Sequence, residues 1–178
     1  LEQHPEWLAD IPGISRRKAE EIGELFRTQF GMRRVMLFLS SYLSPSCAVK
    51  VYQKWGSGAV EIVRQNPYVL CDGIDGIGFE KADQIARDLG VRENSSERIA
   101  AGLAFVLSYN MNQNGHAYLP QDKLIPAAAR LLSCKEEEAE DELARQVMTG
   151  KLRAAKIEGR TCIYLVRAFE AEKYICAK

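Results

Sequence analysis

Two segments of the chain repeat one pattern of residue types, and that pattern suits contact with an anion. Apolar, glycine and alanine positions of residues 11–22 coincide with those of residues 74–85. Each segment contains a glycine, Gly13 or Gly76, where the main chain can turn tightly without a Cβ in the way. A helix is expected after each turn, and its free N–H groups and positive dipole end would face a phosphate.

Side chains at the start of each expected helix favour the same chemistry. Ser15 is suited to cap the first helix, and Gly78 leaves the equivalent place open. Lys18 and Lys81 occupy the same relative place one turn further on. Such contacts position a protein on DNA without reading its bases. The two segments therefore predict a tandem helix-hairpin-helix that binds the DNA backbone.

The two hairpins differ in charge. Arg16 and Arg17 precede Lys18 and make the first helix start basic, whereas Asp75 and Glu80 flank the second turn. Because carboxylates repel phosphate, we expect the first hairpin to be the stronger DNA contact. For either hairpin, the alternative is that the motif only packs helices together.

A weaker copy of the pattern lies between the two hairpins. Residues 42–51 follow the same register, with Ala48 at the place of Ala19. Tyr42 stands where the pattern has glycine. We expect this middle copy to keep the packing of the motif and to bind phosphate poorly.

Five aromatic side chains in this half could stack on unpaired bases. They are Tyr42, Tyr52, Trp55, Tyr68 and Phe79. At helical spacing such residues are more often part of the core, and we take this view of the first four. Phe79 is predicted at the tip of the second hairpin and is counted among the DNA contacts.

Helical periodicity and turn signals place the remaining elements. Gly31, Gly56 and Gly58 are interpreted as helix stops, and Ser95 as a helix cap after a polar stretch. The cap sets a domain boundary between residues 94 and 95. In the first domain, 1–94, helices are predicted over 16–30, 33–42, 46–55, 59–65 and 79–89.

The second domain, 95–178, has a different order of elements. Helix 99–111, extended residues 117–119, helices 123–132 and 136–148, strands 151–157 and 161–166, and helix 168–176 are predicted. This order indicates a winged-helix-like α+β domain, and the alternative is a three-helix bundle that carries a hairpin. The whole chain is thus expected to be mainly α. Arg153, Lys156 and Arg160 of the predicted hairpin are expected to contact DNA.

Composition bounds the class of protein. The chain has 178 residues, 47% hydrophobic and 27% charged, which is typical of a folded soluble protein. No apolar run is long enough for a membrane span, and the polar start lacks a signal peptide. Leu1 in place of Met indicates a piece of a longer protein. Five widely spaced cysteines and two histidines argue against zinc and fit reduced thiols in a cytoplasmic protein.

The net charge of zero hides an uneven distribution. Residues 143–178 contain eight Lys or Arg against three Glu, whereas residues 136–142 form an acidic run. The sequence has no phosphate-binding loop of the G-x-x-x-x-G-K type, no nucleophile elbow and no carboxylate–histidine constellation for a nuclease metal. His116 is interpreted as a turn residue. We therefore expect no catalytic site, and a nuclease or ligase is disfavoured.

A specific string of residues resembles a known family. Residues 66–70, 74–79 and 82–86 read Asn-Pro-Tyr-Val-Leu, Ile-Asp-Gly-Ile-Gly-Phe and Ala-Asp-Gln-Ile-Ala. They resemble the N-terminal region of the long RecD-like DNA helicases (TraA/YrrC type), relatives of the exodeoxyribonuclease V alpha subunit. Residues 115–120, Gly-His-Ala-Tyr-Leu-Pro, follow in the order of that family. The resemblance covers roughly residues 8–178, and Tyr42 and Ser15 depart from its usual glycines.

The resemblance implies a function. In that family this region precedes a motor that moves 5′ to 3′ on DNA with ATP and magnesium, in DNA repair and recombination. The chain would be a non-catalytic accessory region without a cofactor of its own. Its partners would be single-stranded DNA or duplex–single-strand junctions, and the helicase motor in cis, with no membrane. The alternative is a protein-interaction scaffold that docks on the motor or another repair protein, which the zero net charge and the acidic run favour.

Overall fold

The structure, a computed structural model, describes residues 5–176, and most of them are helical. The mainly α fold class is confirmed. Contacts divide the chain into two units, residues 1–86 and residues 87–178. This division falls inside helix α5 (Phe79–Asp88), whereas the sequence placed the boundary in the loop that follows the helix.

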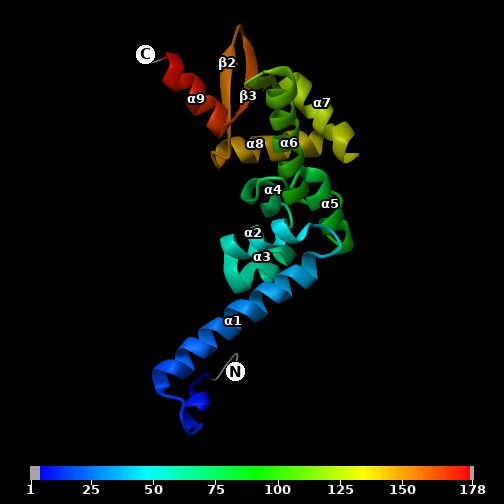
Figure 1. Ribbon diagram of the computed structural model, residues 1–178. Coiled ribbons are helices and arrows are strands. Elements are labelled where there is room, and N and C mark those ends of the chain that lie inside the picture. The colour runs from blue at the N-terminus through cyan, green and yellow to red at the C-terminus, as the bar shows by residue number, and fades with distance from the viewer. Residues whose placement is uncertain (1–4, 177–178) are drawn as a thin grey trace. The chain divides into compact units, whose positions relative to one another are not determined.

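The first unit is built from short helices around one long one. Figure 1 shows the short 3-10 helix η1 against the N-terminal part of α1, and α2 and α3 against its C-terminal part. The elements are η1 (Pro5–Asp10), α1 (Arg16–Leu39), α2 (Pro45–Trp55), the 3-10 turn η2 (Gly56–Gly58), α3 (Ala59–Gln65), α4 (Val69–Gly73) and α5.

Gly31 does not stop a helix, so the prediction of separate helices over 16–30 and 33–42 is wrong. The helix α1 runs through Gly31 without a break. A Cβ at this position would lie 3.0 Å from the ring of Tyr52 on α2. Gly31 therefore allows two helices to approach closely, which a sequence pattern cannot distinguish from a helix end. Gly56 does end α2, with φ of 61°.

The core of the first unit joins the middle and second copies of the repeated pattern. Ala48 and Val51 of the middle copy and Ile77 and Ile85 of the second lie in one buried cluster. Leu39 and Leu70 are fully buried in the same cluster. Ala19 of the first copy is also fully buried, but its neighbour Ile22 is 36% exposed. The middle copy thus keeps the packing of the motif, as predicted.

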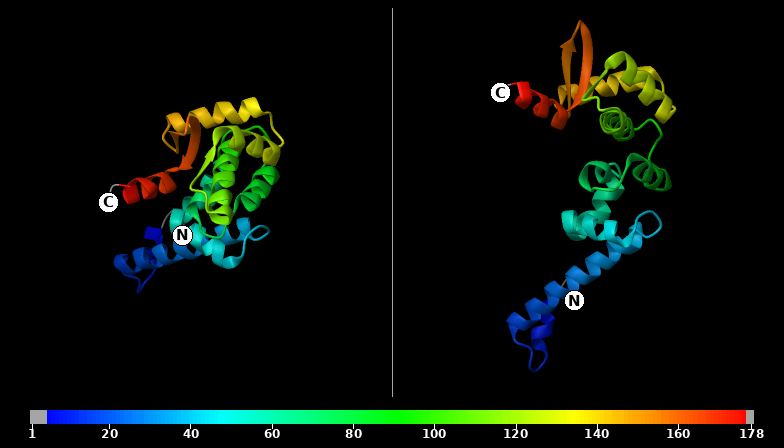
Figure 2. Two further views of the ribbon diagram at one scale, coloured as in Figure 1. Left: turned by 90° about the horizontal axis from the view of Figure 1, so that it is seen from above. Right: turned by 45° about the horizontal axis from the view of Figure 1, so that its top comes forward.

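The second unit has the order of elements of a winged-helix domain, as predicted. Its sheet is antiparallel with strand order β1-β3-β2. Figure 2 shows the β2–β3 hairpin projecting beyond the helices of this unit. The elements are α6 (Ser96–Asn114), β1 (Tyr118–Pro120), α7 (Gln121–Leu132), α8 (Glu136–Met148), β2 (Leu152–Ile157), β3 (Arg160–Leu165) and α9 (Val166–Cys176).

Buried polar groups join the helices of the second unit. The Arg98 guanidinium donates at 2.9 Å to the carbonyl of Leu132 at the end of α7. Ser96 donates to the buried carboxylate of Glu142 on α8 at 2.5 Å. Ser95 caps α6 as expected, and Gly115 ends it in the left-handed conformation. These bonds fix α6, α7 and α8 around one core and so position the sheet.

Among the described residues, none of the helices combines the length and the apolar character that a membrane span needs.

Candidate nucleic-acid interface

The first and second hairpins have the same backbone geometry. Gly13 and Gly76 take φ values of 91° and 93°, which favour glycine. In each turn, the N–H of the next residue donates to the carbonyl two residues before the glycine, with Ile14 3.1 Å from Ile11 and Ile77 3.2 Å from Ile74. The space beside both glycines is open. A ligand could therefore approach the main chain at either turn.

The starts of the helices after the hairpins differ in how they are capped. Ser15 Oγ accepts from the Lys18 N–H at 3.3 Å, so its predicted role as a cap is confirmed. In the middle copy, Ser44 accepts from Cys47 at 3.4 Å in the same way. Gly78 has no side chain to do this for α5. The first turn of α5 thus depends more on an external acceptor than that of α1.

The basic side chains of the first hairpin are engaged in weak pairs. Arg16 lies 3.9 Å from Glu20, and Arg17 lies 3.1 Å from Glu21, one helical turn on. All four side chains are more than half exposed. Exposed pairs of this kind contribute about 0.3–0.5 kcal/mol. A phosphate could therefore displace either glutamate, and Lys18 is exposed beside them.

The middle hairpin has a different turn. Tyr42 occupies the place of the glycines but does not take a positive φ. Its side chain packs against the core of the unit instead. The backbone conformation that opens the other two turns to a ligand is absent at Tyr42.

Two lysines that the sequence did not single out lie beside the second hairpin. Lys50 Nζ is 3.4 Å from the carbonyl of Asp75, and Lys54 Nζ is 2.8 Å from that of Gly73. Both lysines belong to α2. They bring positive charge to a turn whose own flanks, Asp75 and Glu80, are acidic. The sequence pattern of the hairpins does not reveal these two lysines, because their partners in the turn lie about twenty residues further along the chain.

The prediction that Phe79 contacts DNA is wrong. Its side chain is only 4% exposed and stacks on Tyr68, with ring centroids 5.9 Å apart. The Tyr68 hydroxyl donates to buried Asp83 at 2.7 Å. Both rings therefore belong to the core and cannot stack on bases. Tyr52 and Trp55 also pack against the core, as expected. Lys81, in contrast, is exposed at the start of α5.

The basic residues of the β2–β3 hairpin do not all share a face. Arg153 is opposite Tyr164, Ile157 is opposite Arg160, and Lys156 is opposite Thr161. Since side chains alternate along a strand, Arg153 and Arg160 lie on one face and Lys156 on the other. All three are exposed. A single phosphate backbone could contact Arg153 and Arg160 together.

The helix that would enter a DNA groove in a helix-turn-helix is acidic here. Helices α7 and α8 form such a pair, joined by residues 133–135, and α8 is in the position of the recognition helix. Its exposed residues include Glu136, Glu137, Glu140 and Asp141. This surface would repel DNA, so the hairpin is the basic part of the second unit.

The two glycine turns, each followed by a helix, give the first unit the geometry of a tandem helix-hairpin-helix module. Modules of this class contact the phosphate backbone of DNA. The chain belongs to the family described as the HHH domain of the ATP-dependent RecD2 DNA helicase, which matches residues 28–118. It is 24% identical, over 189 aligned residues, to the ATP-dependent RecD2 DNA helicase of Deinococcus radiodurans. That alignment covers 99% of this chain and 26% of the relative, so the chain spans about a quarter of the relative's length.

The region that matches the family does not include the whole candidate interface. Residues 28–118 contain the middle and second hairpins and end at the start of β1. The first hairpin and the β2–β3 hairpin lie outside it. Within the matched residues, the second hairpin is the turn in which glycine takes a positive φ and is open to a ligand.

Proposed function

We propose that this chain holds the backbone of single-stranded DNA, or of a duplex–single-strand junction, on behalf of a 5′-to-3′ helicase motor in the same polypeptide. ATP and magnesium would act in that motor, and this region would be non-catalytic. The supporting observation is the pair of matching glycine turns, each open to a ligand and each followed by a helix whose first turn contains a lysine. Backbone contacts of this kind carry no base information.

The proposed contacts fall into three groups. The first hairpin is proposed as the stronger site, because its arginines are held only by exposed pairs. The second hairpin contributes a helix start at which Gly78 has no side chain to serve as a cap, and the β2–β3 hairpin adds exposed cations. The residues are Gly13, Ser15, Arg16, Arg17 and Lys18, then Gly76, Gly78 and Lys81, then Arg153, Lys156 and Arg160.

Fluorescence anisotropy with a labelled tailed duplex tests the proposal. The chain should bind at low salt, and the logarithm of the association constant should fall linearly with the logarithm of salt concentration, because bound phosphates release counterions. Oligonucleotides of different sequence but equal structure should bind alike. An absence of binding at low salt, or a strong sequence preference for the duplex, would refute it.

The proposed ranking of the hairpins needs a second comparison. Replacing Arg16, Arg17 and Lys18 together with Ala should weaken binding more than Lys81→Ala does. Arg130→Ala, an exposed cation on α7 outside the proposed contacts, is the matched control and should have no effect. Because three charges are removed at once, the salt slope should also fall, by roughly one for each phosphate that is no longer neutralised. If the triple variant and Lys81→Ala lose the same affinity for DNA, the first hairpin is not the stronger site.

A second candidate function rests on the acidic surface of α8. Its exposed carboxylates lie on the helix that contacts DNA in a helix-turn-helix protein. Because these carboxylates are negative, they favour a basic protein surface as the partner. The helicase motor or another repair protein would then dock on the second unit. Cross-linking of the chain to the purified motor in the absence of DNA tests this candidate, and charge-neutral variants of α8 should lose the cross-link.

A further inference from the structure

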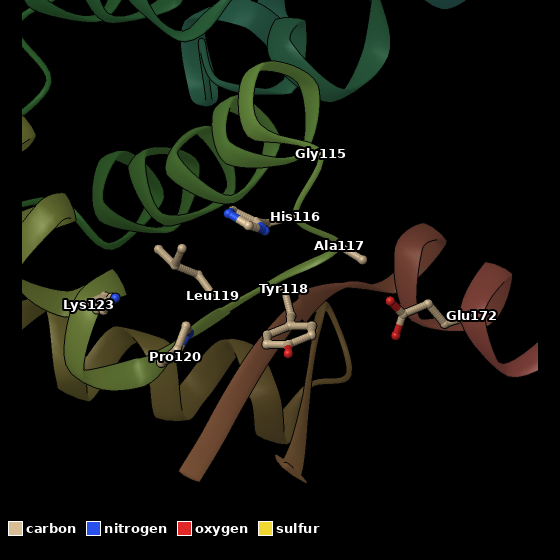
Figure 3. Close-up of a pocket in the computed structure, with 8 residues that line it drawn as sticks. All are labelled: Gly115, His116, Ala117, Tyr118, Leu119, Pro120, Lys123 and Glu172. Atoms are coloured by element: carbon tan, nitrogen blue, oxygen red, sulfur yellow. The ribbon is translucent and has the colours of Figure 1, made fainter. Parts of the chain in front are cut away.

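A pocket in the second unit lies outside the proposed backbone contacts. Its volume is about 370 Å³, and its walls come from the end of α6, from β1, from the first turn of α7 and from α9. A pocket of this size is in the range that binds small molecules or parts of polymers. Figure 3 shows its lining residues, Gly115, His116, Ala117, Tyr118, Leu119, Pro120, Lys123 and Glu172.

Opposite charges stand at the two sides of this pocket. In Figure 3, His116, Leu119 and Lys123 lie on one side of Tyr118, and Glu172 reaches toward β1 on the other. Lys123 is in the first turn of α7, where the helix dipole adds to its positive charge. Asp122 is in the same turn but is not among the residues that line the pocket. No side chain caps the start of α7, since Pro120 is its cap residue. The side with Lys123 thus favours an anion, and Glu172 favours a hydrogen-bond donor.

Tyr118 provides an aromatic surface between the two charges. One side of its ring packs on Tyr164, with centroids 5.2 Å apart. Tyr164 in turn contacts Phe169 of α9 at 5.3 Å, edge to face. The carboxylate of Glu172 is close enough to the Tyr164 phenol to raise its pKa, so it lies beside this aromatic pair. The core of the unit therefore fixes the aromatic surface, which does not depend on a ligand for its placement.

We infer that this pocket binds one nucleotide unit, with its phosphate at Lys123 and His116, its base on Tyr118 and an amino group of the base donating to Glu172. The inference rests on the proposed DNA function and adds a contact with a base to it. A base that stacks on a tyrosine gains affinity whatever its identity. Glu172 accepts hydrogen bonds only, so it favours cytosine, which has an amino group, over thymine, which has a carbonyl at that place. The nucleotide could come from a single strand or be free.

Amide NMR of the whole 178-residue chain can separate this pocket from the hairpins. A tetranucleotide of deoxycytidine should shift the amides of Gly115, Ala117 and Tyr118, and one of thymidine should do so more weakly. A parallel titration with deoxycytidine monophosphate shows whether the pocket takes a free nucleotide or part of a strand. If the monophosphate binds as tightly as the tetranucleotide, the ligand is a free nucleotide. If it binds much more weakly, the ligand is a strand. Shifts only at Gly13 and Gly76 would overturn the pocket and leave the proposed function standing. Shifts nowhere would overturn both.

Substitutions at two pocket residues test the assigned roles. Lys123→Ala should weaken binding of the deoxycytidine tetranucleotide about fivefold and lower its salt slope by about one, since one phosphate is then no longer neutralised. Arg130→Ala on the same helix should change neither. Glu172→Gln should abolish the preference for cytosine over thymine, because an amide can both donate and accept. Equal effects of Lys123→Ala and Arg130→Ala, or a preference that survives Glu172→Gln, would refute the inference.

Discussion

At the scale of single residues, the raised pKa of Tyr164 can be measured in the absence of DNA. Burial, followed by the negative charge of Glu172 and the hydrogen bond with it, raises the pKa of Tyr164 from its usual 10 to about 12. All three causes favour the neutral phenol in the folded state. Its contribution to stability is therefore complete below pH 10 and is lost as the pH rises from 10 to 12.

An ultraviolet titration of tyrosinate can measure this shift. The difference between the wild type and Tyr164→Phe should titrate near 12. Glu172→Gln should lower the midpoint, because it removes a negative charge beside the phenol. The chain unfolded in urea is the control and should titrate near 10. A midpoint near 10 in the folded chain would contradict both the burial of this phenol and the effect of Glu172 on it.

The sequence predicted the role of a residue correctly only where that role depends on the local backbone conformation. Ser15 caps its helix and Gly13 and Gly76 take positive φ because turn and cap geometry depends on near neighbours in the chain. Phe79 was misassigned because its burial depends on Tyr68, which packs from a different element. Lys50 and Lys54 were missed for the same reason, since their partners follow two helices later.

At the scale of secondary-structure elements, glycines at helix contacts determine how closely helices pack. Gly73 ends α4, and a Cβ there would lie 2.7 and 2.8 Å from two ring atoms of Trp55 on α2. Lys54 Nζ would be 3.2 Å away. The α2–α4 contact fixes the turn of the second hairpin, because Gly73 and Asp75 both accept from α2 lysines.

Gly73→Ala should therefore destabilise the first unit. The extra methyl group forces the Trp55 ring or α4 to move, at a cost of about 1–3 kcal/mol. Gly58→Ala is the matched control, because the space beside Gly58 is open and its φ of −79° suits alanine. The control should be neutral or stabilise by up to about 1 kcal/mol. Urea unfolding followed by circular dichroism measures both, and equal stabilities would contradict the close contact.

The turn of the β2–β3 hairpin contains a residue in an unfavourable conformation. Glu158 and Gly159 have φ of 50° and 80°, which corresponds to a two-residue turn with both residues left-handed. Asn at the first position suits this turn, whereas Glu incurs the left-handed cost. Glu158→Asn should stabilise the second unit by roughly 1 kcal/mol. Glu158→Gln removes the charge but keeps the conformational cost, so thermal unfolding of this control should match the wild type.

Element bounds were predictable where periodicity and end signals agree. The helix α8 has the predicted bounds, Glu136–Met148, since its acidic first turn and apolar spacing both mark it. The Asn114-Gly115 turn signal likewise ends α6. Periodicity failed at Gly31, because close packing of α1 on Tyr52 and a helix stop both require glycine. The distinction lies in tertiary contact, which a single sequence does not contain.

At the scale of the whole molecule, a net charge of zero means that DNA affinity depends on where charge is placed. Glu136, Glu137 and Glu140 are exposed on α8 and can be neutralised without loss of the helix. Glu138, which accepts from the Lys135 N–H at 3.0 Å, and buried Glu142 are left in place. A variant with the three exposed glutamates changed to Gln removes three negative charges.

If α8 is turned away from DNA, this variant should gain affinity for a tailed duplex only through the change in net charge. The gain should be roughly two- to fivefold at low salt and should disappear near 0.15 M, where exposed charges are screened over about 8 Å. A control with Glu93, Glu97 and Glu170 changed to Gln has the same net charge and should show the same gain. A much larger gain for the α8 variant would place α8 against DNA and contradict its assignment as a protein-facing surface.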